Sequence, residues 1–436
     1  VTGHKTGEEY TLKETIAPDG YTIASNTKFT IDTDGTVKVG GTAVEGNHIL
    51  VKDAPTEVKI SKTDITGQQE LDGAKLQVIK TDDEGKESVV EEWVSGQNGE
   101  KVHTIKGLLT GVEYTLRETV APDGYAITTD TTFTIGTDGS VTYTGTKNDD
   151  GVLLVKDDIT KVKISKVDIT SQEELEGAHI QIIKPDGDVF EEWNSGNPMD
   201  RDAEGNIKPH EVEGLVAGVE YTLRETVAPH GYKITTDTKF KLNPDGTISS
   251  ESTTPVSDKG VLLVNDEMTT VSISKMDITN DKELPGASLK ITDTDGNTVK
   301  MWDKTKKEWV DAEWTSAATP QKIFGLKTGT TYKLVEVAPP AGYKKAAATE
   351  FKLKKDGTID TASTTTPMND GVLLVEDKPI VDVEVKKAWD DEDDKFGIRP
   401  KSVTVKLLAD GNYTGKTLVL KEDASDPAKS WTGKFE

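Results

Sequence analysis

The clearest pattern along the chain is the strict alternation at the start of Tyr114–Tyr125, which reads YTLRETVAPDGY. Tyr114, Leu116 and Glu118 share one face of such a segment, as they would in a half-buried strand. The Ala-Pro-Asp-Gly that follows is typical of a turn, because proline fixes φ and glycine allows a positive φ. The pattern therefore predicts a strand whose core face carries a carboxylate, and a buried carboxylate requires either a partner or a chemical role.

The same segment recurs along the chain at regular distances. Further copies are Tyr10–Tyr21, Tyr221–Tyr232 and, more loosely, Tyr332–Tyr343. The intervals between their central glutamates are 104, 107 and 111 residues (118 − 14, 225 − 118 and 336 − 225). These glutamates are Glu14, Glu118, Glu225 and Glu336. A period of this length is typical of an immunoglobulin-sized β-sandwich and is far longer than a solenoid repeat.

Two further alternating segments accompany the glutamate segment. One reads ILVKD, LLVKD, LLVND or LLVED, and it ends in Asp53, Asp157, Asp266 and Asp377. The other reads VKISK, VSISK or VEVKK, and it ends in Lys62, Lys166, Lys275 and Lys387. Each complete repeat therefore has three strands whose core faces end in one lysine, one glutamate and one aspartate.

The short links between an aspartate segment and the next lysine segment mark the expected domain boundaries. They predict complete domains over 55–158, 159–267 and 268–378. Residues 1–54 hold the C-terminal half of a domain, and 379–436 hold the N-terminal part of a further domain. Because few residues separate neighbouring domains, we expect a stiff string of domains. Because the first and last domains are partial, we expect that the chain is cut from a longer array at both ends.

Composition supports an all-β fold and excludes several functions. The chain has 39 Gly and 17 Pro and no long window of helical periodicity, which favours a tandem array of immunoglobulin-like β-sandwiches. A net charge of −25 argues against nucleic acid as a partner. With no cysteine, neither a disulfide framework nor a thiolate site is possible. No apolar run approaches the length of a membrane span, so we expect no membrane association.

We expect neither a metal nor a cofactor. The six histidines share no ligand spacing, and the acidic run Asp390–Asp394 lacks the Gly and Glu positions of a calcium loop. No order of Ser, His and Asp recurs between the repeats. An enzyme that acts on an external substrate is therefore not expected.

The three ionisable residues of each repeat allow two interpretations. They can form a buried salt-bridge triad, although desolvation of such groups can exceed the Coulomb gain. Alternatively, a desolvated lysine that loses its proton is a nucleophile, and a neutral amine beside a protonated aspartic acid can form an amide with loss of water. The glutamic acid would then hydrogen-bond the aspartate and shuttle protons. Spacing alone does not decide between them.

The ordered set VKISKTD, ELDGA, YTLRETVAPDGY and VLLVKD resembles the Cna B-type (pilin-like, SpaA-like) repeat domains of Gram-positive surface adhesins and pili. The resemblance implies inverted, prealbumin-like sandwiches, many of which carry a self-formed isopeptide bond. It implies a lysine on the first strand, a glutamate before the turn and an acceptor on the last strand. The implied triads are Lys62/Glu118/Asp157, Lys166/Glu225/Asp266 and Lys275/Glu336/Asp377.

The chain departs from the pattern of most members at the acceptor position. Most members have Asn there, whereas all four copies here have Asp, as in the Lys–Asp subgroup. Asn265 precedes Asp266, but alternation turns it outward, so Asp266 is the expected acceptor. The segment ending at Asp53 resembles the tag strand of split self-ligating domains, and Lys387 begins a domain similar to another branch of the family.

The resemblance implies a structural function rather than an enzymatic one. We expect the stalk of a cell-wall-anchored adhesin or pilus-like protein, extracellular, either a monomeric rod or part of a fibre, with self-formed Lys–Asp bonds. An adhesin module that binds a host protein or glycan is the alternative, and Trp302 and Trp309 in the Met301–Val310 insertion mark where to look. Otherwise host partners are expected to bind domains outside this chain.

Overall fold

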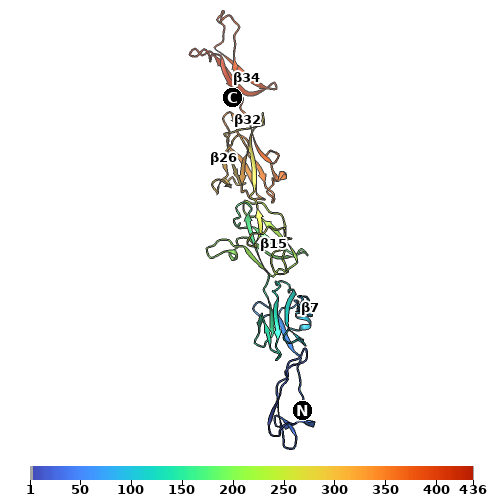
Figure 1. Ribbon diagram of the computed structural model, residues 1–436. Coiled ribbons are helices and arrows are strands. Elements are labelled where there is room, and N and C mark those ends of the chain that lie inside the picture. Colours follow the sequence, from blue (N-terminus) through green and yellow to red (C-terminus); the bar gives the residue numbers. More distant parts are fainter. Residues whose placement is uncertain (1–2, 436) are drawn as a thin grey trace. The chain divides into compact units, whose positions relative to one another are not determined.

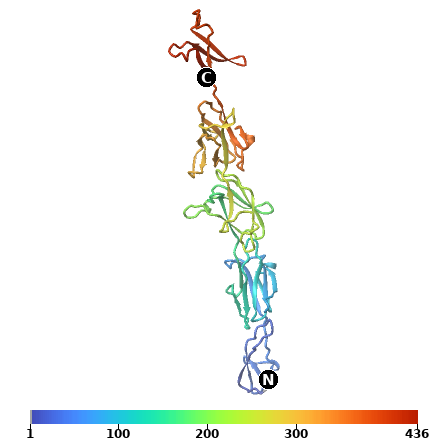
Figure 2. The ribbon, with the colours of Figure 1, turned by 45° about the horizontal axis from the view of Figure 1, so that its top comes forward.

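Strands and loops build every part of the chain in the computed structural model, which describes residues 3–435 (Figure 1, Figure 2). The described residues contain no α-helix, only four short 3-10 turns. These turns are η1 (Glu45–Asn47), η2 (Gln97–Gly99), η3 (Pro198–Asp200) and η4 (Thr361–Ser363). The all-β fold that the alternation and composition predict is confirmed. No helix in this part of the chain is long and apolar enough to span a membrane.

The chain forms two compact units. One comprises the residues up to Val227 together with Thr235–Asn265, and the other comprises Ala228–Ile234 together with Asp266 onward. The turn at Ala228–Ile234 thus groups with the residues that follow it, although the sequence repeat places it in the preceding segment.

The 55–158 segment is a sandwich of two sheets. Its strands are β5 (Glu57–Asp64), β6 (Lys75–Thr81), β7 (Glu87–Val94), β8 (Val102–Lys106), β9 (Glu113–Val120), β10 (Thr131–Ile135), β11 (Val141–Tyr143), β12 (Thr146–Lys147) and β13 (Leu153–Asp157). One sheet has the order β11-β10-β9-β6-β7 and the other β12-β13-β5-β8. Strand β9 buries Tyr114, Leu116 and Glu118 in alternation, as its pattern predicts.

The first and last strands of this sandwich are neighbours. Strands β5 and β13 run parallel, with Val155 opposite Lys62. Such a parallel pair requires a long crossover, which here is the rest of the segment. The apolar residues of both sheets face each other in one core that includes Ile60, Leu76 and Phe133.

The 159–267 segment repeats this arrangement. Its strands are β14 (Lys161–Asp168), β15 (His179–Ile183), β16 (Val189–Asn194), β17 (His210–Glu213), β18 (Glu220–Val227), β19 (Thr238–Lys241) and β20 (Leu262–Asp266). The two sheets have the orders β17-β14-β20 and β16-β15-β18-β19. A second core forms between them, with Ile180, Tyr221 and Phe240 among its buried residues.

The 268–378 segment contains a third core, which includes Leu289, Tyr332 and Phe351. Its strands are β21 (Thr270–Asp277), β22 (Lys282–Glu283), β23 (Ser288–Thr292), β24 (Lys300–Asp303), β25 (Glu308–Asp311), β26 (Glu313–Thr315), β27 (Gln321–Phe324), β28 (Thr331–Ala338), β29 (Tyr343–Lys344), β30 (Thr349–Lys352), β31 (Met368–Asn369) and β32 (Val372–Pro379). Strand β21 runs parallel to β32, as β5 does to β13. The inserted residues form the hairpin β24–β25, in which Trp302 lies opposite Trp309.

The two end segments are less complete. Strands β1 (Glu9–Leu12), β2 (Thr27–Ile31), β3 (Val37–Val39) and β4 (Thr42–Ala43) form one sheet in 1–54. In 379–436 there are two antiparallel pairs, β33 (Val383–Lys386) with β36 (Thr432–Phe435) and β34 (Ser402–Ala409) with β35 (Asn412–Lys421).

One predicted strand is absent. Residues 49–53, which end in Asp53, form no strand, so the expectation that this ILVKD segment is a strand was wrong. Its counterpart β13 is held by the parallel ladder with β5. Residues 1–54 contain no lysine segment of this kind, and without a partner the alternating pattern alone does not form a strand.

Candidate functional site

In the 55–158 segment the three predicted residues meet inside the sandwich. Lys62 lies on β5, Asp157 on the neighbouring strand β13, and Glu118 on β9 of the facing sheet. Lys62 Nζ is 3.0 Å from Glu118 Oε1 and also pairs with Asp157 Oδ1. The lysine side chain is 1% exposed and both carboxylates are 0% exposed. The alternation that placed each residue on a core face therefore brings all three together in a dry site.

The 268–378 segment holds the same arrangement. Lys275 Nζ is 3.3 Å from Glu336 Oε1 and 2.5 Å from Asp377 Oδ1. The three side chains are again almost completely buried. The weaker sequence match of this segment, in which the glutamate strand reads YKLVEVAPPAGY, does not change the geometry.

In the 159–267 segment the lysine and glutamate are also in contact. Lys166 Nζ is 3.0 Å from Glu225 Oε1, and both side chains are 0% exposed. Asp266 is fully buried and ends β20, the strand next to the lysine strand β14 in the sheet order. Asn265 is only half-buried, as the alternation predicts.

A backbone hydrogen bond fixes the carboxylate of each glutamate, and the sequence pattern did not predict this bond. The N–H of Thr128 donates to Glu118 Oε2 at 3.0 Å, and Thr235 and Ala346 donate to Glu225 and Glu336 at 2.8 and 2.6 Å. Ala24 does the same for Glu14 at 2.6 Å. The donor lies ten residues after each glutamate, beyond the turn. The turn therefore folds the chain back so that one carboxylate oxygen is held and the other faces the lysine.

Burial favours the neutral form of one acid in the 55–158 triad and of one acid in the 268–378 triad. Desolvation raises the pKa of Asp157 to about 7; Lys62 opposes this shift and the charge of Glu118 adds to it. Desolvation also raises the pKa of Glu336, against its backbone hydrogen bond and Lys275. A buried site with one lysine and two acids is thus arranged to hold one of its acids protonated near neutral pH.

Three predicted residues of the end segments, Glu14, Asp53 and Lys387, are not brought to a complete site. In 1–54, Glu14 and Asp53 are half-buried, and desolvation, together with Glu14, raises the pKa of Asp53. In 379–436, Lys387 Nζ donates to the Ala388 carbonyl at 2.8 Å and lies over the Trp389 ring. Neither end segment holds all three residue types of the triad in position.

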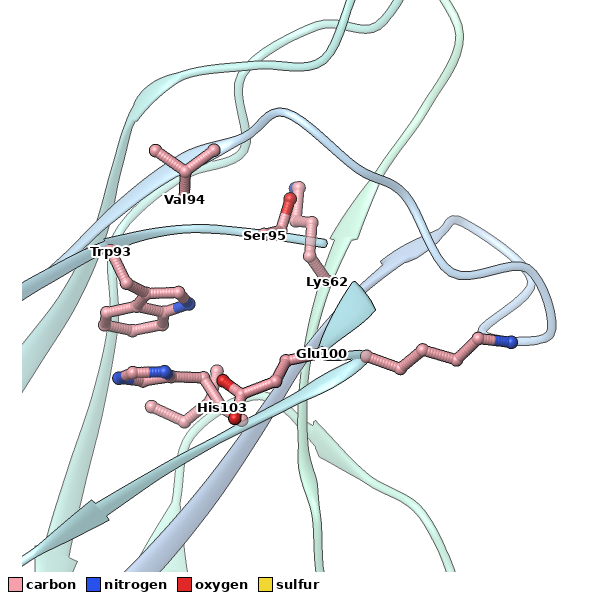
Figure 3. Close-up of a pocket in the computed structure, with 8 residues that line it drawn as sticks. Lys62, Trp93, Val94, Ser95, Glu100 and His103 are labelled. Carbon is pink, nitrogen blue, oxygen red and sulfur yellow. The ribbon is translucent and has the colours of Figure 1, made fainter. Parts of the chain in front are cut away.

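A small cavity reaches the lysine from one side of the sandwich (Figure 3). Its volume is about 10 Å³, roughly the space of one water molecule. Lys62, Ser95 and Glu100 line it, together with a stacked pair of rings, Trp93 and His103, whose centroids are 4.3 Å apart. Figure 3 shows the indole of Trp93 facing the imidazole of His103.

No cluster of His, Cys, Asp or Glu within residues 3–435 has the arrangement of a metal site. The triad itself consists of one amine and two carboxyl groups.

The sequence matches the SpaA prealbumin-like fold domain over residues 1–43, 56–149, 160–255 and 269–367, and the Cna protein B-type domain over residues 383–436. It is 24% identical over 264 residues to a collagen adhesin of Staphylococcus aureus, a match that covers 59% of this chain and 20% of the adhesin. The chain thus spans only a minor part of that relative.

Solved structures with a similar fold include the TIE protein of Bacillus anthracis, at 19% identity and a TM-score of 0.35. That match covers 81% of this chain and 59% of the TIE protein. Another is the shaft pilin SpaA of Lactobacillus rhamnosus GG, at 16% identity and a TM-score of 0.22, covering 50% of this chain and 97% of the pilin. Because the family matches extend over most of its length, the chain belongs to the SpaA prealbumin-like fold domain family, with a Cna protein B-type domain at its C-terminal end.

Proposed function

We propose that this chain is part of the extracellular stalk of a Gram-positive surface adhesin or pilus-like protein, and that Lys–Asp amide bonds cross-link its complete segments. The observation that carries the proposal is the burial of a lysine amine against carboxylates from two other strands. The expected bonds join Lys62 to Asp157, Lys166 to Asp266 and Lys275 to Asp377.

The reaction is a condensation that the triad can complete alone. The neutral Nζ of Lys62 attacks Cγ of the protonated Asp157 carboxyl, and a C–N bond forms. The Asp157 C–O bond to the hydroxyl then breaks, and Glu118 carries a proton from the amine to the departing hydroxyl, which leaves as water. An amine and a carboxylic acid thus give one amide and one water, and no external reactant is needed.

The electrostatics favour this chemistry over a permanent ion pair. A triad of one ammonium, one carboxylate and one carboxylic acid has zero net charge, yet its ions remain desolvated at a cost that the pairing does not always offset. Moving one proton from Lys62 to the carboxylate leaves three neutral groups without exchanging a proton with solvent. The dry site therefore stabilises the reactive protonation state relative to the ionic one.

The released water has a place to go. The cavity beside Lys62 has the volume of about one water molecule and is lined by polar groups of Ser95, Glu100 and His103. The Trp93–His103 stack lines the same cavity. We infer that the cavity receives the water and that the stack limits the return of solvent.

Replacing Glu118 by glutamine should block or slow the bond of the 55–158 segment while leaving the other two unchanged. Glutamine keeps the side-chain size but cannot carry the proton. Intact mass should then show one water more than the parent chain. Glu113→Gln is the matched control, because Glu113 lies on the same strand but is exposed. Loss of all waters by the Glu118→Gln chain at the normal rate would remove the glutamate from the mechanism.

The rate of bond formation should fall as the pH rises above about 7. The pKa of Asp157 is raised to about 7, so the protonated acid is present below that pH and is lost above it. The neutral reactive triad holds the same number of protons as the triad of one ammonium, one carboxylate and one carboxylic acid, which prevails below about pH 7. Above about pH 7 that triad loses a proton, so the rate of bond formation should drop about tenfold per pH unit. Unfolded, unreacted chain diluted into buffers between about pH 6 and 9 and followed by mass would measure this. A rate that increases across the same range would contradict the proposed protonation state.

The position of the bond suits a stalk that carries load. Lys62 and Asp157 lie on the first and last strands of their segment, which are also the strands through which tension enters and leaves. An amide between them would pass the load across the segment without pulling on the strands between. The relatives named as adhesin and shaft pilin agree with such a surface role.

The alternative of a binding module rests on the tryptophans of hairpin β24–β25. Trp309 is 38% exposed, but a Cβ added to Gly325 would lie 2.7 Å from its Cη2 atom, so its ring packs closely on the backbone there. Packing accounts for this ring without a ligand. Deleting residues 301–310 and comparing the binding of collagen and of immobilised host glycans would test the alternative, which requires the deletion to abolish binding.

A further inference from the structure

A buried threonine stands at the start of the first strand of each complete segment. Thr56, Thr160 and Thr269 are 0%, 1% and 1% exposed. Each N–H donates at 2.9 Å to the carbonyl of a glycine in the preceding Ala-Pro-X-Gly-Tyr turn. Each hydroxyl donates to the carbonyl of a leucine that precedes the glutamate strand, at 2.6 or 2.7 Å. The leucines are Leu108, Leu215 and Leu326. Each threonine therefore connects the turn before it to a loop that lies more than fifty residues after the threonine.

The turn and the loop approach so closely that only glycine fits. Gly124 has a φ of +83°, and a Cβ there would lie 3.0 Å from the Gly214 carbonyl oxygen. At Gly20 the same distance, to Gly107, is 2.8 Å, and φ is +80°. Gly107 and Gly214 in turn donate their N–H groups to the carbonyls of the threonines, at 3.1 and 3.0 Å. Glycine is required here both for its positive φ and for the space.

A second contact repeats beside the first. The N–H of Ile127, just after the turn, donates at 2.9 Å to the Pro244 carbonyl, next to the Asp245-Gly246 hairpin. Ile23 makes the same bond to Thr137, and Ile234 makes it to Lys355, each at 2.9 Å. At Gly246 a Cβ would lie 3.2 Å from the Ala126 Cβ, so this approach is also close. The residues that follow the turn thus pack against, and hydrogen-bond to, the Asp-Gly hairpin of the next repeat.

We propose that these two contacts form a docking joint, in which the loop before the glutamate strand and the Asp-Gly hairpin receive the turn of the preceding repeat. Linkers between domains usually leave relative motion free unless the interface is well packed. Two hydrogen-bonded contacts at separate points oppose both bending and twisting about the link. The buried threonine satisfies the polar groups of the turn, so the joint loses no backbone hydrogen bond when water is excluded. The joint goes beyond the cross-links and does not depend on them.

The joint at Thr160 can be measured in the full chain. The sequence contains no cysteine, so Thr104→Cys and Glu211→Cys place two spin labels at equivalent exposed positions on either side of it. The distance distribution between the labels should be narrow. Gly124→Ala should broaden it about twofold or more, because the added Cβ meets the Gly214 backbone.

Two further variants keep the test decisive. Gly218→Ala is the matched control, because Gly218 has a φ of +80° but no atom within 4 Å of an added Cβ, and it should leave the distribution narrow. Thr160→Val keeps the side-chain shape but removes the hydroxyl, and it should also broaden the distribution. This variant keeps the test available if Gly124→Ala does not fold. A broad distribution in the parent chain would overturn the joint. So would equal distributions in Gly124→Ala and Gly218→Ala, or no broadening in Thr160→Val.

Discussion

Replacing Asp157 by alanine should turn the 55–158 segment from an element that does not lengthen under load into one that unfolds. In the parent chain the proposed amide between Lys62 and Asp157 encloses 95 residues (157 − 62). Tension would pass through the amide, so these residues would stay folded. Without the amide they would be released, adding roughly 300 Å of chain. Single-molecule stretching of the full chain should therefore show one additional unfolding event in the variant.

The adjacent residue provides the control for this experiment. Asp158 is exposed, whereas Asp157 is buried, so Asp158→Ala should leave the stretching trace unchanged. If the parent chain unravels segment by segment to its full length, load is not carried by amide bonds. The stalk would then lack its mechanical basis.

Replacing Lys62 by methionine should sharply lower the stability of the same segment. A cross-link that closes a loop of about 100 residues removes unfolded-state entropy worth up to about 4.7 kcal/mol. That is a large part of the roughly 5–15 kcal/mol that stabilises a typical domain. Methionine fills a similar volume, but it leaves Asp157 and Glu118 buried without their cation, so the loss combines the missing bond with the cost of these unpaired acids. Calorimetry should show one transition moved down by roughly 20 °C or more.

Lys59→Met makes the same substitution on the same strand. Lys59 is exposed and pairs with Glu57 at 3.4 Å, a type of surface ion pair that adds little stability. Its transitions should move by only a few degrees. Equal shifts for Lys62→Met and Lys59→Met would show that no cross-link stabilises the segment.

Much of the site follows from local patterns in the sequence. Alternation at Tyr114, Leu116 and Glu118 gives the buried face of β9 without any knowledge of its neighbours, because side chains of a strand alternate whatever it pairs with. The same reasoning places Lys62 and Asp157 on core faces. Both interpretations of the triad, a buried salt bridge or an amide, required the three residues to meet, and the distances in the structure agree with this; the family resemblance favoured the amide.

What the sequence could not predict depends on contacts between distant parts of the chain. The hydrogen bond from the Thr128 N–H to Glu118 depends on where the chain lies after the turn, which the alternating pattern of the strand does not describe. The failure of residues 49–53 to form a strand depends on a missing neighbour rather than on their own pattern. The sequence presents Thr160 as an ordinary polar residue of a link, although in the structure it is buried and its hydroxyl bonds to the carbonyls of Gly124 and Leu215. A signal was available, since a threonine recurs at this position in all three complete repeats.

The central claim, that each complete segment closes its own amide bond, is tested most directly by the intact mass of the folded chain. Each bond releases one water, so the mass should lie below that of the sequence by three waters. Fragmentation should locate the losses at Lys62 with Asp157, Lys166 with Asp266 and Lys275 with Asp377. A folded chain with the full mass of its sequence would contradict the claim and leave the triads as buried salt bridges.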